Sequence, residues 1–344
     1  MYSFLNDYNE IAHPNILKAI EKNNLVQTDG YGDDPFCDNA KELIKKEFAL
    51  KNSQIYFFIG GTAVNLTALS YTLRGYECIM ATPQAHICRH EAGSVEATGH
   101  KILTVPSSDG KFDIKAAEKI LEAHLEDEHM VLPRTVYISD STETGTVYTK
   151  KELENISSFC KKNGLYLFLD GARLATGLTS KYSDVAREDL AKLTDMFYIG
   201  ATKNGSPIGE ALVINNPALQ TGFVRHMKQK GSILAKGKIL GICFEELFKD
   251  GLYWELGKHA NDMAFKIIDA LKDYNIDYTF APESNQIFVN LNTVQKHKLA
   301  KIFAFSIDHK INDDLYAARF VTNWATDEKS ANQLIDALKK EFEK

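Results

Sequence analysis

Short, nearly uninterrupted apolar runs alternate with helical stretches between residues 54 and 214. Such runs are typical of parallel strands, because helices cover both faces and neither face needs to be polar. The clearest run is LYLFLD at 165–170, which follows a helix that begins at a Thr149–Glu152 capping box and ends at Gly164. The alternation predicts an α/β fold with a mostly parallel, doubly wound sheet. The other predicted strands are 54–60, 77–82, 99–106, 135–139, 196–202 and 210–214.

A second, smaller domain is predicted near the C-terminus. With 344 residues, the chain exceeds the size at which one hydrophobic core usually stops growing. We expect a large α/β domain at 31–245, a small α+β domain at 246–344, and an N-terminal segment at 1–30 that packs on the small domain. The elements predicted for the small domain are helices at 259–274 and 330–344 and strands at 276–280, 286–291 and 317–325.

Composition argues against several classes of function. The net charge of −6 and the pI of about 6.0 give no basic surface for nucleic acid or an anionic membrane. No apolar run approaches the roughly 18 residues of a membrane span, and the N-terminus lacks the pattern of a signal peptide. The five cysteines form no CxxC pair, so we expect free thiols and no metal site. These features predict a soluble cytoplasmic protein.

One glycine-rich junction has the features of a phosphate site. Ligands of such sheets bind at the carboxyl ends of the strands, and Gly60, Gly61 and Thr62 lie between a predicted strand and a helix. Glycines allow close approach of a ligand, and the free N–H groups of a helix N-terminus attract a phosphate. The same residues also suit an ordinary tight turn, and neither a GxGxxG nor a P-loop pattern occurs in the chain.

Three titratable side chains follow other predicted strands. Asp170 closes an apolar strand and needs a partner for a partly buried carboxylate; Arg173 is one candidate. Lys203 follows a strand among small residues, and a desolvated lysine has a lowered pKa and forms Schiff bases. His86 stands where an imidazole can lie flat on an aromatic ring. Each residue alone has an ordinary structural explanation, but together they form the set that binds pyridoxal 5′-phosphate (PLP): phosphate cradle, stacking ring, acid for the pyridine nitrogen, and lysine.

The chain also resembles the low-specificity threonine aldolases of the β-eliminating lyase group over nearly its whole length. The resemblance implies a fold-type I, aspartate aminotransferase-like enzyme that uses PLP to cleave L-threonine or L-allo-threonine to glycine and acetaldehyde. It also implies a homodimer or homotetramer with the active site at the subunit interface. The likeness is carried by NDYNEIAHPNILKAI, DGYGDDP, GGTAVNLTAL, HICRHEAGSVEATGHK, LFLDGARL, YIGATKNGSPIGEALVI and ARFVTNWAT.

The same resemblance implies a role for each matching residue. Arg319 would grip the substrate carboxylate, a task that suits a bidentate guanidinium, and Arg173 would lie at the cofactor and substrate. Lys228, with Lys230 and Lys236 as rivals, would approach the cofactor phosphate, in some members from the partner subunit. The remaining roles are phosphate binding by Gly60, Gly61 and Thr62, ring stacking by His86, pyridine-nitrogen binding by Asp170 and the Schiff base by Lys203.

Two positions depart from the better-known members. Asn6 stands where many have a serine near the substrate, and Glu143 stands where many have a histidine that faces the substrate hydroxyl. The catalytic base is therefore open among His86, Glu143, Glu91 and a bound water. The alternatives are a PLP-dependent β-elimination or transamination of another small amino acid and a non-catalytic ligand-binding protein on the same scaffold.

Overall fold

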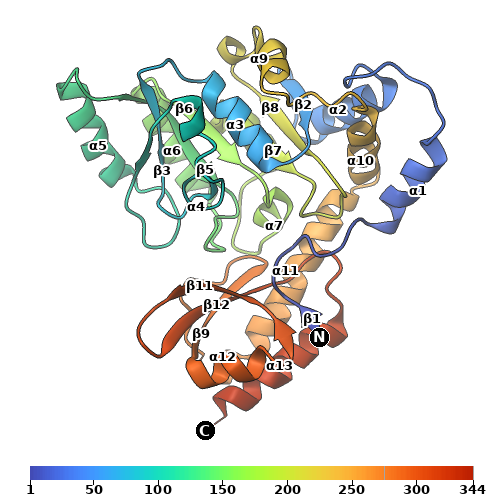
Figure 1. The fold of residues 1–344 in the computed structure, drawn as a ribbon, viewed down its shortest axis with the longest axis vertical. Coiled ribbons are helices and arrows are strands. Elements are labelled where there is room, and N and C mark those ends of the chain that lie inside the picture. The colour runs from blue at the N-terminus through green and yellow to red at the C-terminus, as the bar shows by residue number, and fades with distance from the viewer. Residues whose placement is uncertain (275, 344) are drawn as a thin grey trace.

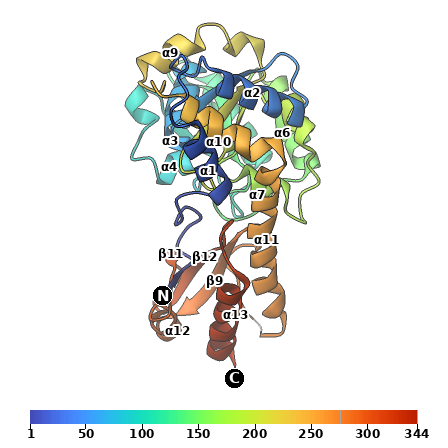
Figure 2. The same ribbon diagram turned by 90° about the vertical axis from the view of Figure 1, so that its right-hand side faces the viewer.

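The computed structural model describes residues 1–274 and 276–343, which form a larger and a smaller body joined by one long helix (Figure 1). This helix, α11 (Leu252–Ala270), begins beside helices α7 and α10 of the larger body and runs down beside the small sheet, as Figure 2 shows. Tyr253 and Trp254 at its start belong to the core of the larger body, whereas Ile267 and Ile268 near its end belong to the core of the smaller body. The predicted boundary at residue 245 falls inside the preceding helix, and we propose α11 as the place where the domains meet.

The larger body is built on a seven-stranded sheet with the order β2-β8-β7-β6-β5-β3-β4. Only β8 runs antiparallel to its neighbours β2 and β7; the remaining pairs in the sheet are parallel. The sheet is thus mostly parallel, as predicted. Its strands are β2 (Gln54–Phe58), β3 (Glu77–Ala81), β4 (Ile102–Thr104), β5 (Leu132–Ser139), β6 (Tyr166–Asp170), β7 (Met196–Gly200) and β8 (Glu210–Ile214).

Helices cover both faces of this sheet, which explains the uninterrupted apolar runs. Along β7, Phe197 and Ile199 enter one core cluster with residues of α2, α5, α6 and α10, while Met196 and Tyr198 enter another with residues of α3 and α9. The helices are α2 (Pro35–Glu47), α3 (Gly61–Tyr71), α4 (His86–Arg89), α5 (Ile114–Glu126), α6 (Lys150–Lys162), α7 (Leu174–Leu178), α8 (Arg187–Leu193), α9 (Phe223–Gln229) and α10 (Lys238–Lys249), with short 3-10 turns at Glu96–Thr98 and Pro217–Leu219.

The smaller body packs a three-stranded antiparallel sheet, of order β11-β12-β9, against α11 and the C-terminal helix. Its elements are β9 (Gln286–Asn292), α12 (Thr293–Leu299), β10 (Phe303–Ala304), β11 (Ser306–Lys310), β12 (Leu315–Val321) and α13 (Glu328–Phe342), after a 3-10 turn at Lys272–Tyr274. The predicted strand at 276–280 is wrong, since that stretch makes one isolated bridge, from Tyr278 to Val289. The predicted last residue of the final helix, Lys344, lies outside the described residues.

The N-terminal segment contacts both bodies. Its strand β1 (Tyr2–Ser3) pairs with β10, and Phe4 is buried in the core of the smaller body. The helix α1 (Pro14–Asn23) instead packs along α10 of the larger body, and its Ile16 belongs to the larger core. Residues 1–30 therefore bridge the two bodies rather than covering the smaller one alone. In the part of the chain that the structure describes, no helix combines the length and apolar character needed to cross a bilayer.

Candidate active site

The strand order reverses its direction between β3 and β5, and the predicted site residues gather at this edge. From β3 the chain moves outward to β4, whereas β5, β6 and β7 follow one another toward the other edge of the sheet. Ligands of doubly wound sheets bind at such a point, beyond the carboxyl ends of the strands. His86 on α4 follows β3 and Glu143 follows β5, and the backbone N–H of His86 donates to Glu143 Oε1 at 2.8 Å.

Asp170, the last residue of β6, is a buried hydrogen-bond acceptor. Its Oδ1 accepts from the backbone N–H of Ala172 at 3.0 Å, and its Oδ2 accepts from the Asn65 side-chain amide at 3.1 Å and from the Tyr137 hydroxyl. Three donors around one carboxyl group suit the carboxylate, which is an acceptor only. Arg173, the candidate partner named from the sequence, does not pair with Asp170, because its guanidinium bonds to a different carboxylate.

That carboxylate is Asp7, which lies 166 residues earlier in the chain. Arg173 donates to Asp7 through Nε at 2.7 Å and through a terminal nitrogen at 3.1 Å, and both side chains are buried. Asn285 from the smaller body also donates to Asp7, at 3.1 Å. Burial alone would raise the pKa of Asp7, but the charge and the hydrogen bonds of Arg173 lower it below its usual value.

Lys203 follows β7 and lines the same small cavity as Asp7 and Arg173. Burial lowers the pKa of Lys203, the positive charge of Arg173 lowers it further, and Asp7 and Asp170 act in the opposite direction. A lysine with a lowered pKa has more of its free amine, the nucleophilic form, near neutral pH. Small residues precede Lys203 because the segments that follow β6 and end β7 pack closely. A Cβ at Gly200 would lie 2.3 Å from the carbonyl oxygen of Ala172.

The predicted phosphate cradle is the N-terminus of α3. Gly60 precedes the helix and Gly61 begins it, and among the described residues no side chain caps its first turn. A Cβ at Gly61 would lie 2.9 Å from the Tyr198 hydroxyl, so a larger residue there would have to displace that ring. Thr62 is exposed. The helix therefore presents backbone N–H groups and one hydroxyl beside the end of β2, an arrangement that suits an anion.

His86 contacts two acidic side chains. Its Nδ1 is 2.8 Å from Glu91 Oε1, and its backbone N–H bonds to Glu143. Glu143 also accepts from the Ser139 hydroxyl at 2.7 Å. Burial raises the pKa of Glu143, and the nearby charge of Asp170 raises it further.

The predicted substrate residues approach from the smaller body and the N-terminus. Arg319 lies on β12, where it donates to Ser306 Oγ at 3.1 Å and to Gln286 Oε1 at 3.3 Å. Burial lowers the pKa of Arg319 and the positive charge of Arg173 lowers it further, which shows that the two guanidinium groups share one region. Asn6 is half-buried next to Asp7 and accepts the backbone N–H of Tyr8 at 2.9 Å.

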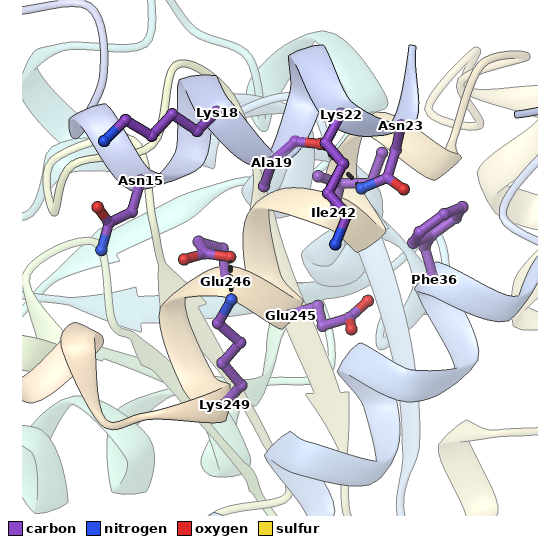
Figure 3. A pocket seen from close by; sticks show the side chains of 10 residues that line it. All are labelled: Asn15, Lys18, Ala19, Lys22, Asn23, Phe36, Ile242, Glu245, Glu246 and Lys249. Atoms are coloured by element: carbon purple, nitrogen blue, oxygen red, sulfur yellow. Dashed lines mark hydrogen bonds and ion pairs between the residues drawn. The ribbon is translucent and has the colours of Figure 1, made fainter. Parts of the chain in front are cut away.

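Lys228 lies apart from this group; of its rivals, Lys230 is the C-cap of the same helix and Lys236 is exposed. Lys228 is exposed on α9, with its Nζ 4.5 Å from the ring centre of Tyr31. In residues 1–274 and 276–343, no contact joins Lys228 to Lys203 or Asp170. Another hollow, of about 420 Å³, lies between α1 and α10, where Lys249 contacts Glu246 (Figure 3). Lys18, Lys22 and Glu245 also line it. None of the side chains that line it is a predicted site residue.

Sequence reasoning missed four residues of this region. Asp7, Asn65, Tyr137 and Glu210 all contact or surround the predicted site. Burial raises the pKa of Glu210 to about 8, and the carboxyl group accepts the backbone N–H of Ala201 at 2.9 Å. Asn65 had a signal, because it is a polar residue on an otherwise apolar face of α3. Asp7 had none, because its partner is distant in the sequence.

Comparison with known proteins places the chain in a family. The sequence profile of beta-eliminating lyases matches residues 13–294. A low specificity L-threonine aldolase of a Pseudomonas strain is 30% identical over 328 residues, which cover 93% of this chain and 92% of that protein. The structure of Leishmania major threonine aldolase is 44% identical with a TM-score of 0.97, and the match covers 99% of this chain and 100% of that one.

The fold comparison extends to aminotransferases. An aspartate aminotransferase mutant of Thermus thermophilus is 12% identical with a TM-score of 0.72, covering 96% of this chain and 89% of that one. This likeness concerns the fold alone, and it confirms the predicted aspartate aminotransferase-like architecture. The family profile matches residues 13–294, and a threonine aldolase of 44% identity shares the fold over nearly the whole chain. The chain therefore belongs to the beta-eliminating lyase family.

Proposed function

We propose that this protein is a PLP-dependent lyase that cleaves the Cα–Cβ bond of L-threonine or L-allo-threonine to give glycine and acetaldehyde. The relatives named as threonine aldolases match the chain over nearly its full length, which favours this reaction over β-elimination or transamination. The observation that carries the proposal is the pair formed by Asp170 and Lys203. The two residues follow adjacent strands, β6 and β7, and Lys203 has a lowered pKa.

The residues present fit the cofactor. Asp170 is a carboxylate with capacity left on Oδ1, so it can hold a protonated pyridine nitrogen. Asn65 beside it has a buried side-chain oxygen with no partner among the described residues. The uncapped start of α3, with Gly60, Gly61 and Thr62, would hold the phosphate. When bound, PLP supplies an electron sink for the bonds at Cα of an amino acid.

Each predicted residue has a task in this proposal. Lys203 would hold the cofactor covalently through its Nζ, and His86 would stack on its ring. Arg319 would bind the substrate carboxylate in a two-pronged contact and so orient the Cα–Cβ bond, with Arg173 and Asn6 beside it. Arg173 brings fewer free N–H groups to this task, because Asp7 already occupies Nε and one terminal nitrogen.

A base must accept the proton of the substrate hydroxyl. His86 and Glu143 are the candidates with exposed surface, and a bound water is the third. Burial and the nearby charge of Asp170 raise the pKa of Glu143, so this carboxyl group keeps its proton to a higher pH than an ordinary glutamate does. General-base help contributes roughly 10²–10⁴-fold to the rate, so single substitutions can rank these candidates.

We further propose a homodimer or homotetramer in which Lys228 of one subunit approaches the phosphate site of its partner. Its exposure, away from Lys203 in its own chain, supports a role across an interface, and the exposed apolar residues Leu25, Val26, Tyr31 and Val224 lie in the segments around it. A cytoplasmic location is also proposed, supported by five cysteines that are all free thiols.

The test is to incubate the purified enzyme with L-threonine, L-allo-threonine and L-serine and to measure glycine, ammonia and keto acid. Glycine with acetaldehyde from either threonine isomer is expected. Ammonia or keto acid as the main product would overturn the proposal in favour of β-elimination or transamination.

A further inference from the structure

A continuous chain of hydrogen bonds joins the histidine that follows β3 to the acid that ends β6. His86 Nδ1 lies 2.8 Å from Glu91 Oε1. The Asn65 side-chain amide donates to that same Oε1 at 2.7 Å and to Asp170 Oδ2 at 3.1 Å. The Tyr137 hydroxyl donates to the same oxygen of Asp170. One amide group thus connects the partner of the histidine with the acid predicted to hold the cofactor.

Glu91 is sealed from solvent. None of its side-chain surface is exposed, and its second oxygen accepts from the Ser94 hydroxyl at 2.6 Å. Asn65, which completes the connection, is also fully buried. A carboxylate in this position cannot touch a substrate, so Glu91 can act only through its neighbours. Its burial is offset by donors on both oxygens, which is the usual condition for keeping a carboxylate inside a protein.

The Glu91 carboxylate determines which nitrogen of the neutral His86 ring carries the proton. A carboxylate only accepts hydrogen bonds, so Nδ1 must donate to it. In the neutral ring the proton then resides on Nδ1, and Nε2 is left as an acceptor. Among the described residues Nε2 has no hydrogen-bond partner, and 32% of the His86 side chain is exposed. Nε2 is therefore available to a ligand.

We propose that Glu91 and Asn65 form a buried brace that holds His86 in its Nδ1–H form and fixes it relative to Asp170, so that Nε2 accepts the substrate hydroxyl proton. In that step the O–H bond breaks, its electron pair stays on oxygen, and an Nε2–H bond forms. The resulting imidazolium lies against the Glu91 carboxylate. Glu91 and Asn65 are positioning residues. The choice of substrate rests on the proposed function, whereas the proton position is a property of the protein itself.

The test reads the proton position directly. Full-length protein labelled with ¹⁵N-histidine, with and without added PLP, is examined by long-range ¹H–¹⁵N NMR at about pH 8.5, where an ordinary imidazole is neutral. His86→Gln assigns the signal. Wild type is expected to show the Nδ1–H form, and Glu91→Gln to keep it, since the amide oxygen can accept the same two donors. Glu91→Ala is expected to lose it.

Glu96→Gln is the matched control, because Glu96 is an exposed glutamate of the same loop. It should leave the His86 signal unchanged. An Nε2–H form in the wild type, or an unchanged signal in a folded Glu91→Ala variant, would overturn the brace. Should Glu91→Ala not fold, the wild-type measurement still decides the question.

Turnover separates the brace from the proposed function. Glu91→Ala is expected to lower kcat about 10²-fold with a small change in KM, and Glu91→Gln to recover most of it. A wild-type enzyme that shows the Nδ1–H form but releases no glycine from threonine would contradict the function and leave the brace standing. Glycine release by the wild type, together with an unaltered histidine signal in Glu91→Ala, would support the function and contradict the brace.

Discussion

Asp170 and Lys203 follow adjacent parallel strands of the large sheet, whereas Arg319 lies within an antiparallel strand of the small sheet. The first two are placed by local backbone, since the glycines at the ends of β6 and β7 let the strands approach closely. Arg319 reaches the same region only because the small sheet is held against the large one. The residues proposed to bind the cofactor, here called the cofactor half, thus lie in one domain. Arg319, proposed to bind the substrate and here called the substrate half, is placed by how the two domains meet.

The N-terminal segment is what ties the halves together. Asp7 accepts from Arg173 of the larger body and from Asn285 of the smaller one. Phe4, three residues earlier, is buried in the smaller core, while α1 packs on the larger body. The comparison therefore predicts that changes at Lys203 affect chemistry, that changes at Asp7 affect stability and geometry, and that changes at Arg319 affect substrate binding.

The largest effect is expected from Lys203→Ala. Without the amine the cofactor has no covalent attachment, and turnover should fall by about 10⁴-fold or more, as when one member of a group that acts as a unit is removed. The measurement is single-turnover glycine release, with thermal unfolding as a check on the fold. Lys162→Ala, at the exposed end of α6, is the matched control. Equal activity of both variants would contradict the assignment of Lys203.

Asp7→Asn should destabilise the protein by about 3–5 kcal/mol, because it leaves Arg173 buried without its charge partner. The pKa of Asp7 is lowered in the folded state, so its contribution is present above the unfolded value and is lost as the pH falls through the folded value. Urea unfolding at neutral and acidic pH measures both effects. A loss of stability that is the same in wild type and variant across the acid range would show that the ion pair does not link the halves.

Arg319→Lys keeps the charge but loses the planar fork, so the substrate carboxylate loses one of two hydrogen bonds. KM for threonine should rise about 10–100-fold while the bound cofactor is unaffected. Steady-state kinetics and the visible spectrum of the enzyme test these two parts. Lys310→Ala, on the neighbouring strand β11, is a control that should change neither. A spectrum altered as strongly as in Lys203→Ala would mean that the two halves are not separable.

A further prediction concerns Glu210, beside the lysine in the cofactor half. Burial raises its pKa from 4.5 to about 8, so the folded protein binds more protons than the unfolded chain between these values. Stability should therefore fall as the pH rises from about 4.5 to 8. Glu210→Gln is expected to flatten this decline, measured by urea unfolding at several pH values. If the stability of Glu210→Gln falls with pH as steeply as that of the wild type, the decline does not come from the proton on Glu210.

The sequence predicted the large sheet well, because its strands are apolar on both faces and stand out as continuous runs. It predicted the small sheet less well. The strand β11 has a mostly polar, exposed sequence, SIDHK, and carries no apolar alternation. The stretch at 276–280 was also predicted as a strand, but in the structure it makes one isolated bridge, from Tyr278 to Val289 of β9.

For the candidate site, the sequence predicted which residues stand at strand ends, but it did not predict which side chains pair with one another. Asp170 ends β6 and Lys203 follows the end of β7, as predicted from the apolar runs that precede them. Arg173 was considered as a partner for Asp170, the nearest acid in the sequence, whereas in the structure it pairs with Asp7 from the N-terminal segment. Contacts over such separations depend on how the domains assemble, and no local pattern encodes them.

Lys203 is proposed to carry PLP at the end of β7, opposite Asp170. To check this assignment, the purified enzyme is incubated with PLP, reduced with borohydride and digested, and the cofactor is located by mass spectrometry. We expect loss of the visible band and a pyridoxyl group on the peptide that contains Lys203. A protein that takes up no PLP, or a pyridoxyl group on a different lysine, would contradict it.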